Sequence, residues 1–372
     1  MSNAFELSFV FLISFIVCGL IRLTRGWHIP LALSREDTKA VQAAHKVPTP
    51  RLGGVAFFAG LLASYFVISA EAHILFLAIL SMLPLFLAGL AEDFGARISA
   101  SGRMLAALIS AALMIWNLNF WLPRLDLPVI DTLMMWAPFA IGVTLFCSAG
   151  VSNAFNLIDG VNGLSGYTGV LVALALSTIA FETGLVVAGE FALYIVAALM
   201  GFLVFNYPWG KVFLGDAGAY VLGHILCWLA IAMVVRVDEL TPWAILLVFF
   251  WPVADTLLAI SRRWGSGRST GHPDRLHFHQ LVMRALEICL FGRRARVYSN
   301  PLSTLILMPM IAAPVLTGVY FWDAPFAAFL ATVFFGTLFA GTYRLGVSLA
   351  RRRKKIWQAQ KSRNLNAEAL PE

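Results

Sequence analysis

Long apolar runs alternate with short polar segments along most of the chain. Each run holds about 17 to 22 residues, the length that crosses a bilayer as a helix. The runs cover residues 5–21, 53–70, 73–91, 104–122, 130–149, 165–183, 186–205, 217–235, 241–260, 301–321 and 325–343. The pattern predicts an all-α polytopic integral membrane protein with about eleven transmembrane helices.

Positive charge gives these helices an orientation. If the amino terminus lies outside, only Arg124 and Arg236 of the 27 lysines and arginines fall on the outer side. Cytoplasmic loops carry the excess of Lys and Arg in membrane proteins. We therefore expect a cytoplasmic carboxyl terminus and cytoplasmic segments at 22–52, 92–103, 150–164, 206–216, 262–300 and a basic tail at 344–372.

Composition supports a single membrane domain over residues 1–372. The chain is 60% hydrophobic and 13% charged, with a mean hydropathy of +0.80, so lipid replaces water around most of it. No internal repeat or long linker is visible. The net charge of +7 then mostly reflects the orientation of the helices in the membrane. The basic run at 351–355 favours a stop-transfer flank over contact with anionic lipid heads.

Two further features fit a retained membrane chain. The first apolar run lacks a basic segment before it, which indicates a first span rather than a cleaved signal peptide. The four cysteines show no metal-ligand spacing, and we expect them to be small core residues: Cys18, Cys147, Cys227 and Cys289.

The segment 153–164 is unusually polar for so apolar a chain. Asn153, Asn156 and, less squarely, Asp159 would share one helix face, and Asn162 follows. Glycines beside them would let backbone approach a ligand closely. A helix cap explains one or two such residues but not four. The segment is therefore a candidate binding site.

Two more candidates lie on the same predicted face. The loop from His45 through Lys46 to Arg51 combines positive charge with two prolines and two glycines, which suits a bound anion, whereas an ordinary basic loop explains only the charges. The adjacent acids Glu92 and Asp93 could serve a metal or act as a general base, with a helix cap as the alternative.

The loop that starts at Asn206 and passes Phe213 ends in Gly-Asp-Ala-Gly, which places Asp216 at the entry to a span. An ionisable residue at membrane depth is a functional candidate by default. Asp255, inside the ninth predicted span, is weaker, because a structural pairing with Arg262 or Arg263 explains it equally well.

Three histidines lie within eight residues in the loop that follows: His272, His277 and His279, with Arg275 among them. Zinc binding by these histidines is one hypothesis, but their spacing is poor for a zinc site and no cysteine is near. Phosphate binding by Arg and His is therefore favoured. Carboxylates for a cation and basic groups for phosphates suit a site that joins two phosphorylated substrates. Mg²⁺ is the natural ion for such oxygen ligands.

These motifs, taken in order, resemble those of the polyprenyl-phosphate N-acetylhexosamine-1-phosphate transferases, glycosyltransferase family 4. The likeness covers residues from about 45 to 285. It implies transfer of N-acetylhexosamine-1-phosphate from a UDP-sugar to undecaprenyl or another polyprenyl phosphate, with release of UMP. It also implies a bacterial inner-membrane enzyme with a cytoplasmic active site, a role in starting O-antigen or other surface polysaccharides, and Mg²⁺ as cofactor, with Mn²⁺ as an alternative.

The resemblance also implies residue roles. Glu92, Asp93 and Asp216 would be catalytic, and Asp216 with Asp93 would hold the metal. The remaining residues would bind substrates, the amides and Phe213 around uridine and the basic groups at the phosphates: Lys46, Arg51, Asn153, Asn156, Asp159, Asn162, Asn206, Phe213, His272, Arg275, His277 and His279.

Three positions depart from the family pattern. Glu92 stands where Asp is usual, Asn162 where a second Asp is common, and Gln280 where a last His is expected. The loop also lacks the three consecutive histidines of the phospho-MurNAc-pentapeptide translocases, which favours the initiating UDP-HexNAc transferases. The expected partners are a UDP-HexNAc, the polyprenyl phosphate and membrane lipid, with no nucleic acid; a homodimer is compatible with this reading.

The alternative function is a multi-span transporter of a lipid-linked sugar or phosphorylated solute. Such transporters place their binding groups near the bilayer midplane, often between internal repeats. Here the polar groups gather at one surface and no repeat is visible. The sequence therefore favours the enzyme.

Overall fold

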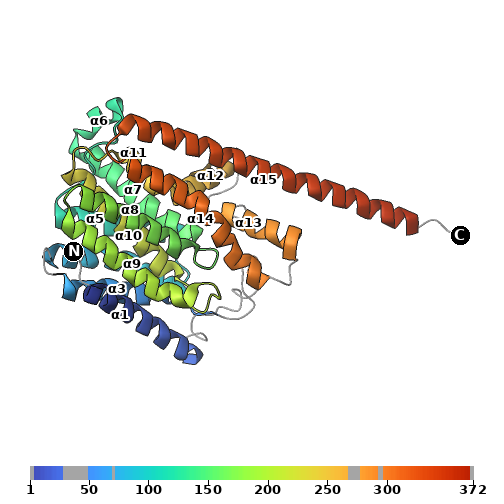
Figure 1. The fold of residues 1–372 in the computed structure, drawn as a ribbon, viewed down its shortest axis with the longest axis horizontal. Coiled ribbons are helices and arrows are strands. Elements are labelled where there is room, and N and C mark those ends of the chain that lie inside the picture. The colour runs from blue at the N-terminus through green and yellow to red at the C-terminus, as the bar shows by residue number, and fades with distance from the viewer. Residues whose placement is uncertain (1–3, 28–48, 69–71, 267–276, 292–295, 369–372) are drawn as a thin grey trace.

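A computed structural model describes residues 4–27, 49–68, 72–266, 277–291 and 296–368. In these ranges the chain is helical with short connections and forms no strand (Figure 1). The α-helices are α1 Ala4–Leu23, α3 Gly53–Val67, α4 Ala72–Asp93, α5 Ala100–Leu118, α6 Pro128–Met134, α7 Ala137–Ile158, α8 Leu164–Glu182, α9 Val186–Asn206, α10 Gly215–Arg236, α11 Pro242–Val248, α12 Phe250–Ser266, α13 Phe278–Leu286, α14 Arg296–Tyr320 and α15 Pro325–Glu368, with a π-helical turn, η1, at Glu287–Phe291.

Each predicted apolar run overlaps one or two of these helices, so the prediction of an all-helical, multi-pass membrane protein is confirmed. Within the described ranges, nine helices are long and apolar enough to cross a membrane. A tenth span would be the pair α11 and α12, which meet at an 83° bend. Helix α3 has only 15 residues, about 22 Å at the usual rise, which is short of a bilayer's hydrocarbon core.

The fifth predicted run is displaced. The sequence placed a span at 130–149 and a loop at 150–164, but residues 128–134 form the separate helix α6 and α7 continues to Ile158. Pro128 and Pro138 each lie at the start of a helix, where a proline is tolerated, so two helices form where one was expected. The predicted end of the span at residue 149 is therefore wrong, and Asn153 and Asn156 lie on α7, in keeping with the helix face that the sequence suggested.

Helix α10 lies at the centre of the bundle. The apolar stretch of α10 is 89% buried inside the protein. Helix α10 contacts α3, α4, α7 and α8. Glycines permit the closest of these contacts: a Cβ at Gly54 would lie 2.3 Å from Gly218 N, and one at Gly89 would lie 2.5 Å from Ala217 N. Both close approaches are at the first turn of α10, which is thereby fixed against α3 and α4.

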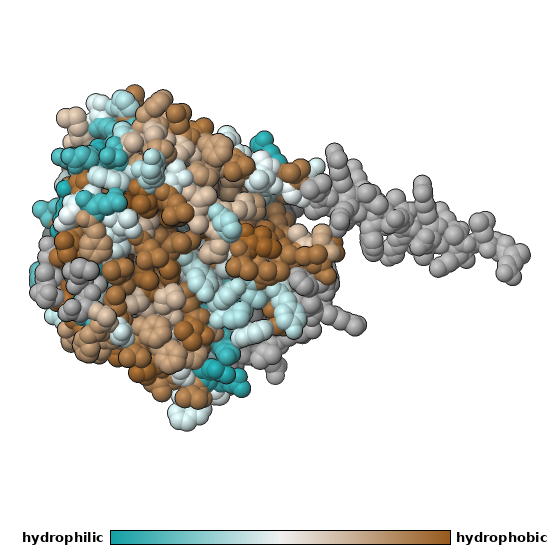
Figure 2. Space-filling view, viewed as in Figure 1, coloured by the Kyte–Doolittle hydropathy of each residue, from teal (hydrophilic) through white to brown (hydrophobic). Residues whose placement is uncertain are grey.

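Apolar side chains cover much of the visible face of the body (Figure 2), including exposed Leu, Phe and Trp residues of the long helices. Lipid is the natural neighbour of such a surface in a multi-pass protein. The cysteine prediction is confirmed at Cys18 and Cys227, which are buried, while Cys147 is half-buried. It is wrong at Cys289, which is exposed because η1 lies at the surface.

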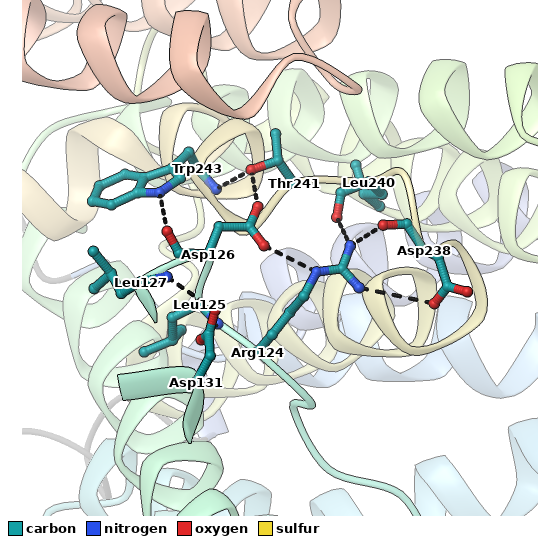
Figure 3. Close-up of polar contacts among 9 residues, drawn as sticks. All are labelled: Arg124, Leu125, Asp126, Leu127, Asp131, Asp238, Leu240, Thr241 and Trp243. Carbon is teal, nitrogen blue, oxygen red and sulfur yellow. Dashed lines mark hydrogen bonds and ion pairs between the residues drawn. The ribbon is translucent and has the colours of Figure 1, made fainter. Parts of the chain in front are cut away.

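A polar network joins two connections at the end of the bundle where α5 and α10 finish (Figure 3). Arg124 donates to Asp126 at 3.0 Å and to the carbonyls of Asp238 and Leu240. Asp131 in α6 accepts two backbone N–H groups of the same connection, and Thr241 donates to Asp126. These bonds satisfy irregular backbone, so the network is structural.

Candidate active site

The opposite end of the bundle gathers acidic side chains from three helices. Asp93 is the last residue of α4, and its side chain is buried. Its Oδ1 accepts the backbone N–H of Asp216 at 2.9 Å and its Oδ2 that of Ala217 at 3.0 Å. A carboxylate is favourable at these N–H groups because they begin helix α10. Asp93 therefore ties the end of one central helix to the start of another.

Asp216 lies beside this contact with its carboxylate only partly buried. Asn156 of α7 donates to its Oδ1 at 2.6 Å, and Arg51 Nη2 lies 3.5 Å from the same oxygen. The Nε of Arg51 is also 3.7 Å from Asp93. One guanidinium thus bridges two carboxylates that would otherwise repel each other. The structure brings together Arg51, Asn156 and the two acids, four residues that the sequence singled out.

The chain turns into α10 through Gly215, whose φ of +76° is in the left-handed region. A Cβ there would lie 2.0 Å from the Arg51 carbonyl and 2.6 Å from Asp93 Oδ2. Backbone bonds fix the same place, since Gly53 N donates to Phe213 and Gly54 N to Leu214. Only glycine fits here, and this explains why the Gly-Asp-Ala-Gly run can place an acid against Arg51 and Asp93.

Glu92 points to a different neighbour from Asp93. Arg103 at the start of α5 donates to Glu92 Oε1, while Glu92 Oε2 is buried and has no hydrogen-bond partner among the described residues. The two adjacent acids therefore differ in environment: Asp93 is held by backbone of α10, and Glu92 by one arginine. Arg103 itself was not singled out from the sequence, although its place eleven residues after Glu92 in a polar segment was visible.

Asp159 follows the last residue of α7 and faces the same cluster. Burial raises the pKa of this carboxyl to about 7, with Asp216 adding to the rise, while Arg51 and the N–H of Gly215 act in the opposite direction. A carboxyl group with a pKa raised this far can accept or release a proton near neutral pH.

The amides of Asn162 and Asn206 hold the surrounding loops together. Asn162 donates from Nδ2 to the Pro208 carbonyl, and its backbone N–H is bound by Asn300 of α14. Asn206 accepts the Gly163 N–H at 2.6 Å and donates to the Val212 carbonyl. Both side chains are buried. Their predicted substrate contacts stay predictions, but the bonds shown here shape the walls of the site.

Two histidines at the start of α13 contact Asp255 of α12 and Gly160. His277 Nδ1 lies 2.9 Å from Asp255, so the expected pairing of Asp255 with Arg262 or Arg263 is wrong; Arg262 donates to Tyr343 instead. The His279 ring lies against Gly160, where a Cβ would be 2.4 Å from its Nε2. Burial lowers the pKa of His279 to about 4, so this ring is neutral at pH 7.

The remaining predicted residues are less central. Asn153 donates to the Ala149 carbonyl of its own helix, and Phe213 is half-buried in the loop before α10. Lys46, His272 and Arg275 lie outside the described residues. Asn300 was missed from the sequence, because a single amide near the start of an apolar run carries no signal of its own.

The carboxylates of Asp93 and Asp216 are the oxygen donors of the cluster that a divalent cation would use. Asp216 Oδ1 accepts the amide N–H of Asn156, and Asp93 accepts the backbone N–H of Asp216, so the two carboxylates lie at the same helix start. Among the described residues no group of three or more His, Cys, Asp or Glu could enclose a metal ion. One or two carboxylates with phosphates completing the shell is the arrangement that Mg²⁺ prefers, whereas a closed zinc site needs four protein ligands.

The fold and site define a multi-pass membrane protein with an acidic, arginine-bridged centre at one end of its helices. The sequence model of glycosyl transferase family 4 matches residues 75–234, which include both Asp93 and Asp216. Over these residues the chain is similar to this family.

Other proteins extend the likeness over most of the chain. One is the decaprenyl-phosphate N-acetylglucosaminephosphotransferase of Mycobacterium tuberculosis, 26% identical over 83% of this chain and 85% of its own length. Another is the probable undecaprenyl-phosphate N-acetylglucosaminyl 1-phosphate transferase of Bacillus subtilis, 25% identical over 82% and 84%. The undecaprenyl-phosphate α-N-acetylglucosaminyl 1-phosphate transferase of Yersinia pestis is 25% identical over 96% and 97%.

Proposed function

We propose that this protein transfers N-acetylhexosamine-1-phosphate from a UDP-sugar to undecaprenyl or a similar polyprenyl phosphate. The observation that carries the proposal is the meeting of Asp93, Asp216 and Arg51 at the end of the central helix α10. The relatives named above act on polyprenyl phosphates, and their similarity extends over more than four fifths of the chain. The product would start a lipid-linked surface polysaccharide such as O-antigen.

In the proposed reaction, an oxygen of the polyprenyl phosphate forms a bond to the β-phosphorus of the UDP-sugar. The bond from that phosphorus to the oxygen bridging the two phosphates breaks, and UMP leaves with the electron pair. Both reactants are anions, and two unit charges 4 Å apart repel by about 4 kcal/mol at an effective dielectric near 20. The site must therefore supply positive charge before the reactants can approach.

Arg51 supplies part of that charge from within the cluster. Asp216 and Asp93 would hold Mg²⁺, which when bound supplies further positive charge to the phosphates. Asp93 fixes the start of α10, and Asn156 orients Asp216 through its amide N–H. Asp159 lies beside them with a pKa near 7 and could take a proton from the acceptor phosphate.

The test uses purified protein in detergent with undecaprenyl phosphate and a panel of donors: UDP-GlcNAc, UDP-GalNAc and UDP-MurNAc-pentapeptide. We expect UMP release and a lipid-diphospho-sugar with one of the first two donors. Asp216→Asn should abolish turnover, since the amide keeps the shape and loses the charge. Asp323→Asn is the matched control, because Asp323 is exposed at the other end of the bundle. Absence of UMP release with every donor would refute the proposal.

A further inference from the structure

Asp255 is a buried carboxylate of α12 that the acidic cluster does not include. Its side chain is almost fully enclosed, at 1% exposure, within a segment apolar enough to cross a membrane. A carboxylate in such a place is costly unless it is paired and hydrogen-bonded, and it is then a candidate for function. The contacts of its two carboxylate oxygens therefore indicate its role.

Both oxygens bind the segment that leads into α13. Asp255 Oδ2 lies 2.9 Å from His277 Nδ1, and Oδ1 accepts the backbone N–H of Phe278 at 3.1 Å. An ionised carboxylate only accepts hydrogen bonds, so Nδ1 of His277 carries a proton. Because the two nitrogens lie on opposite sides of an imidazole ring, Nε2 then points away from Asp255.

The ring so held lies against His279. His277 and His279 are nearly parallel, with ring centroids 5.7 Å apart and an interplanar angle of 14°. The Nε2 edge of His279 is against Gly160, the residue after Asp159. His279 has neither ring nitrogen hydrogen-bonded within the described part of the chain, and burial keeps it neutral. It therefore packs as a spacer between His277 and the turn that carries Asp159.

Helix α13 is also held in place by aromatic packing. The Phe278 ring contacts Trp251, Phe339 and Tyr343, with ring centroids 5.2, 5.2 and 6.2 Å away. This aromatic packing attaches α13 to α12 and α15 without help from Asp255. A conservative change at Asp255 should therefore alter the ring of His277 and leave the helix in place.

We propose that Asp255 is a positioning residue of the transferase, which fixes the His277 ring so that its Nε2 faces the phosphates of the UDP-sugar. The inference rests on the proposed function and deepens it by dividing the two histidines: His277 contacts the donor, and His279 acts as a packing spacer. Groups that orient a functional histidine through its second nitrogen typically change activity about 10- to 100-fold when removed.

Asp255→Asn tests the geometry with little change of shape. The amide oxygen can still accept the Phe278 N–H, but the amide N–H group then meets Nδ1 and displaces the proton to Nε2. We expect about a tenfold or greater loss of kcat/KM for the UDP-sugar, with KM for undecaprenyl phosphate within about twofold of wild type, as expected of distant sites. Glu287→Gln is the matched control: Glu287 is also a buried acid, but it pairs with Arg296, and its loss should leave the donor KM unchanged.

A double-mutant cycle separates positioning from structure. If Asp255 acts through His277, the variant carrying both Asp255→Asn and His277→Gln should be no less active than His277→Gln alone. If the two losses multiply, Asp255 has an independent structural role and the inference is wrong. A wild type that turns over no donor refutes the proposed function instead.

A spectroscopic measurement needs no turnover. With ¹⁵N-labelled histidine, the His277 signals are those missing from His277→Gln among the seven histidines of the chain. We expect a protonated Nδ1 in the wild type and an unprotonated Nδ1 in Asp255→Asn. An Nδ1 without a proton in the wild type would overturn the inference even if the enzyme is active.

Discussion

A single methyl group at Gly89 should disable the site through backbone alone. Gly89 lies one turn before Asp93 on α4, and its Cα faces the start of α10. In Gly89→Ala the new Cβ would lie 2.5 Å from Ala217 N, 2.6 Å from Ala217 Cα and 2.8 Å from Asp216 C. All three neighbours are backbone atoms, so no flexible side chain can move to make room.

The required shift follows from these distances. Ordinary contacts of a Cβ begin near 3.4 Å, so α4 and α10 must separate by about 1 Å at this level. Overpacking of this kind typically costs about 1–3 kcal/mol of stability. A displacement of about 1 Å between reacting groups can cost about a hundredfold in rate. The displaced groups are Asp93 and Asp216, whose contact depends on the same helix ends.

The assay is UMP release at saturating donor and acceptor, together with the thermal midpoint in detergent. We expect about a hundredfold lower kcat and a lower midpoint for Gly89→Ala. Gly150→Ala on α7 is the matched control, because a Cβ there meets nothing within 4 Å and alanine has the higher helix propensity. The reasoning fails if Gly89→Ala keeps activity within threefold of wild type, or if Gly150→Ala is equally impaired.

Three further predictions use the same assay or simple labelling. Asp93→Asn should be severe because its amide N–H would face the N–H groups of α10, whereas Glu92→Gln should be mild; the reverse order would exchange their roles. Because burial raises the folded pKa of Asp159 to about 7, above its ordinary value of 3.8, folding favours the protonated form. Stability should thus fall as pH rises from about 4 to 7, and Asp159→Asn should flatten this slope in thermal melts. A cysteine at Lys211 should resist an impermeant thiol reagent in intact cells while one at Thr183 reacts; labelling at Lys211 would reverse the predicted orientation.

The apolar runs of the sequence were sufficient to predict the helices, because lipid demands a fixed length of apolar residues whatever the neighbours are. Asp93, Asp216, Asn156 and Arg51 could also be selected, since polar groups are conspicuous in so apolar a chain. The hydrogen-bond and ion-pair partners of these residues could not be predicted from the sequence. Hydropathy showed an acidic pair at 92–93 but not that Asp93 binds the backbone of α10 while Glu92 binds Arg103.

Only the tertiary structure decided the contacts between residues far apart in the chain. Asp255 could be paired with a nearby arginine from the sequence, but the bend between α11 and α12 and the aromatic anchor of Phe278 bring His277 to it instead. Helix α7 starts later than predicted for a similar reason, because α6 folds separately and is held by Asp131 in the polar network around Arg124. The sequence by itself determined which segments enter the membrane and which residues are polar there. Which of those polar groups meet depends on glycine-sized close approaches such as Gly89 to Ala217, and these exist only once two helices are packed.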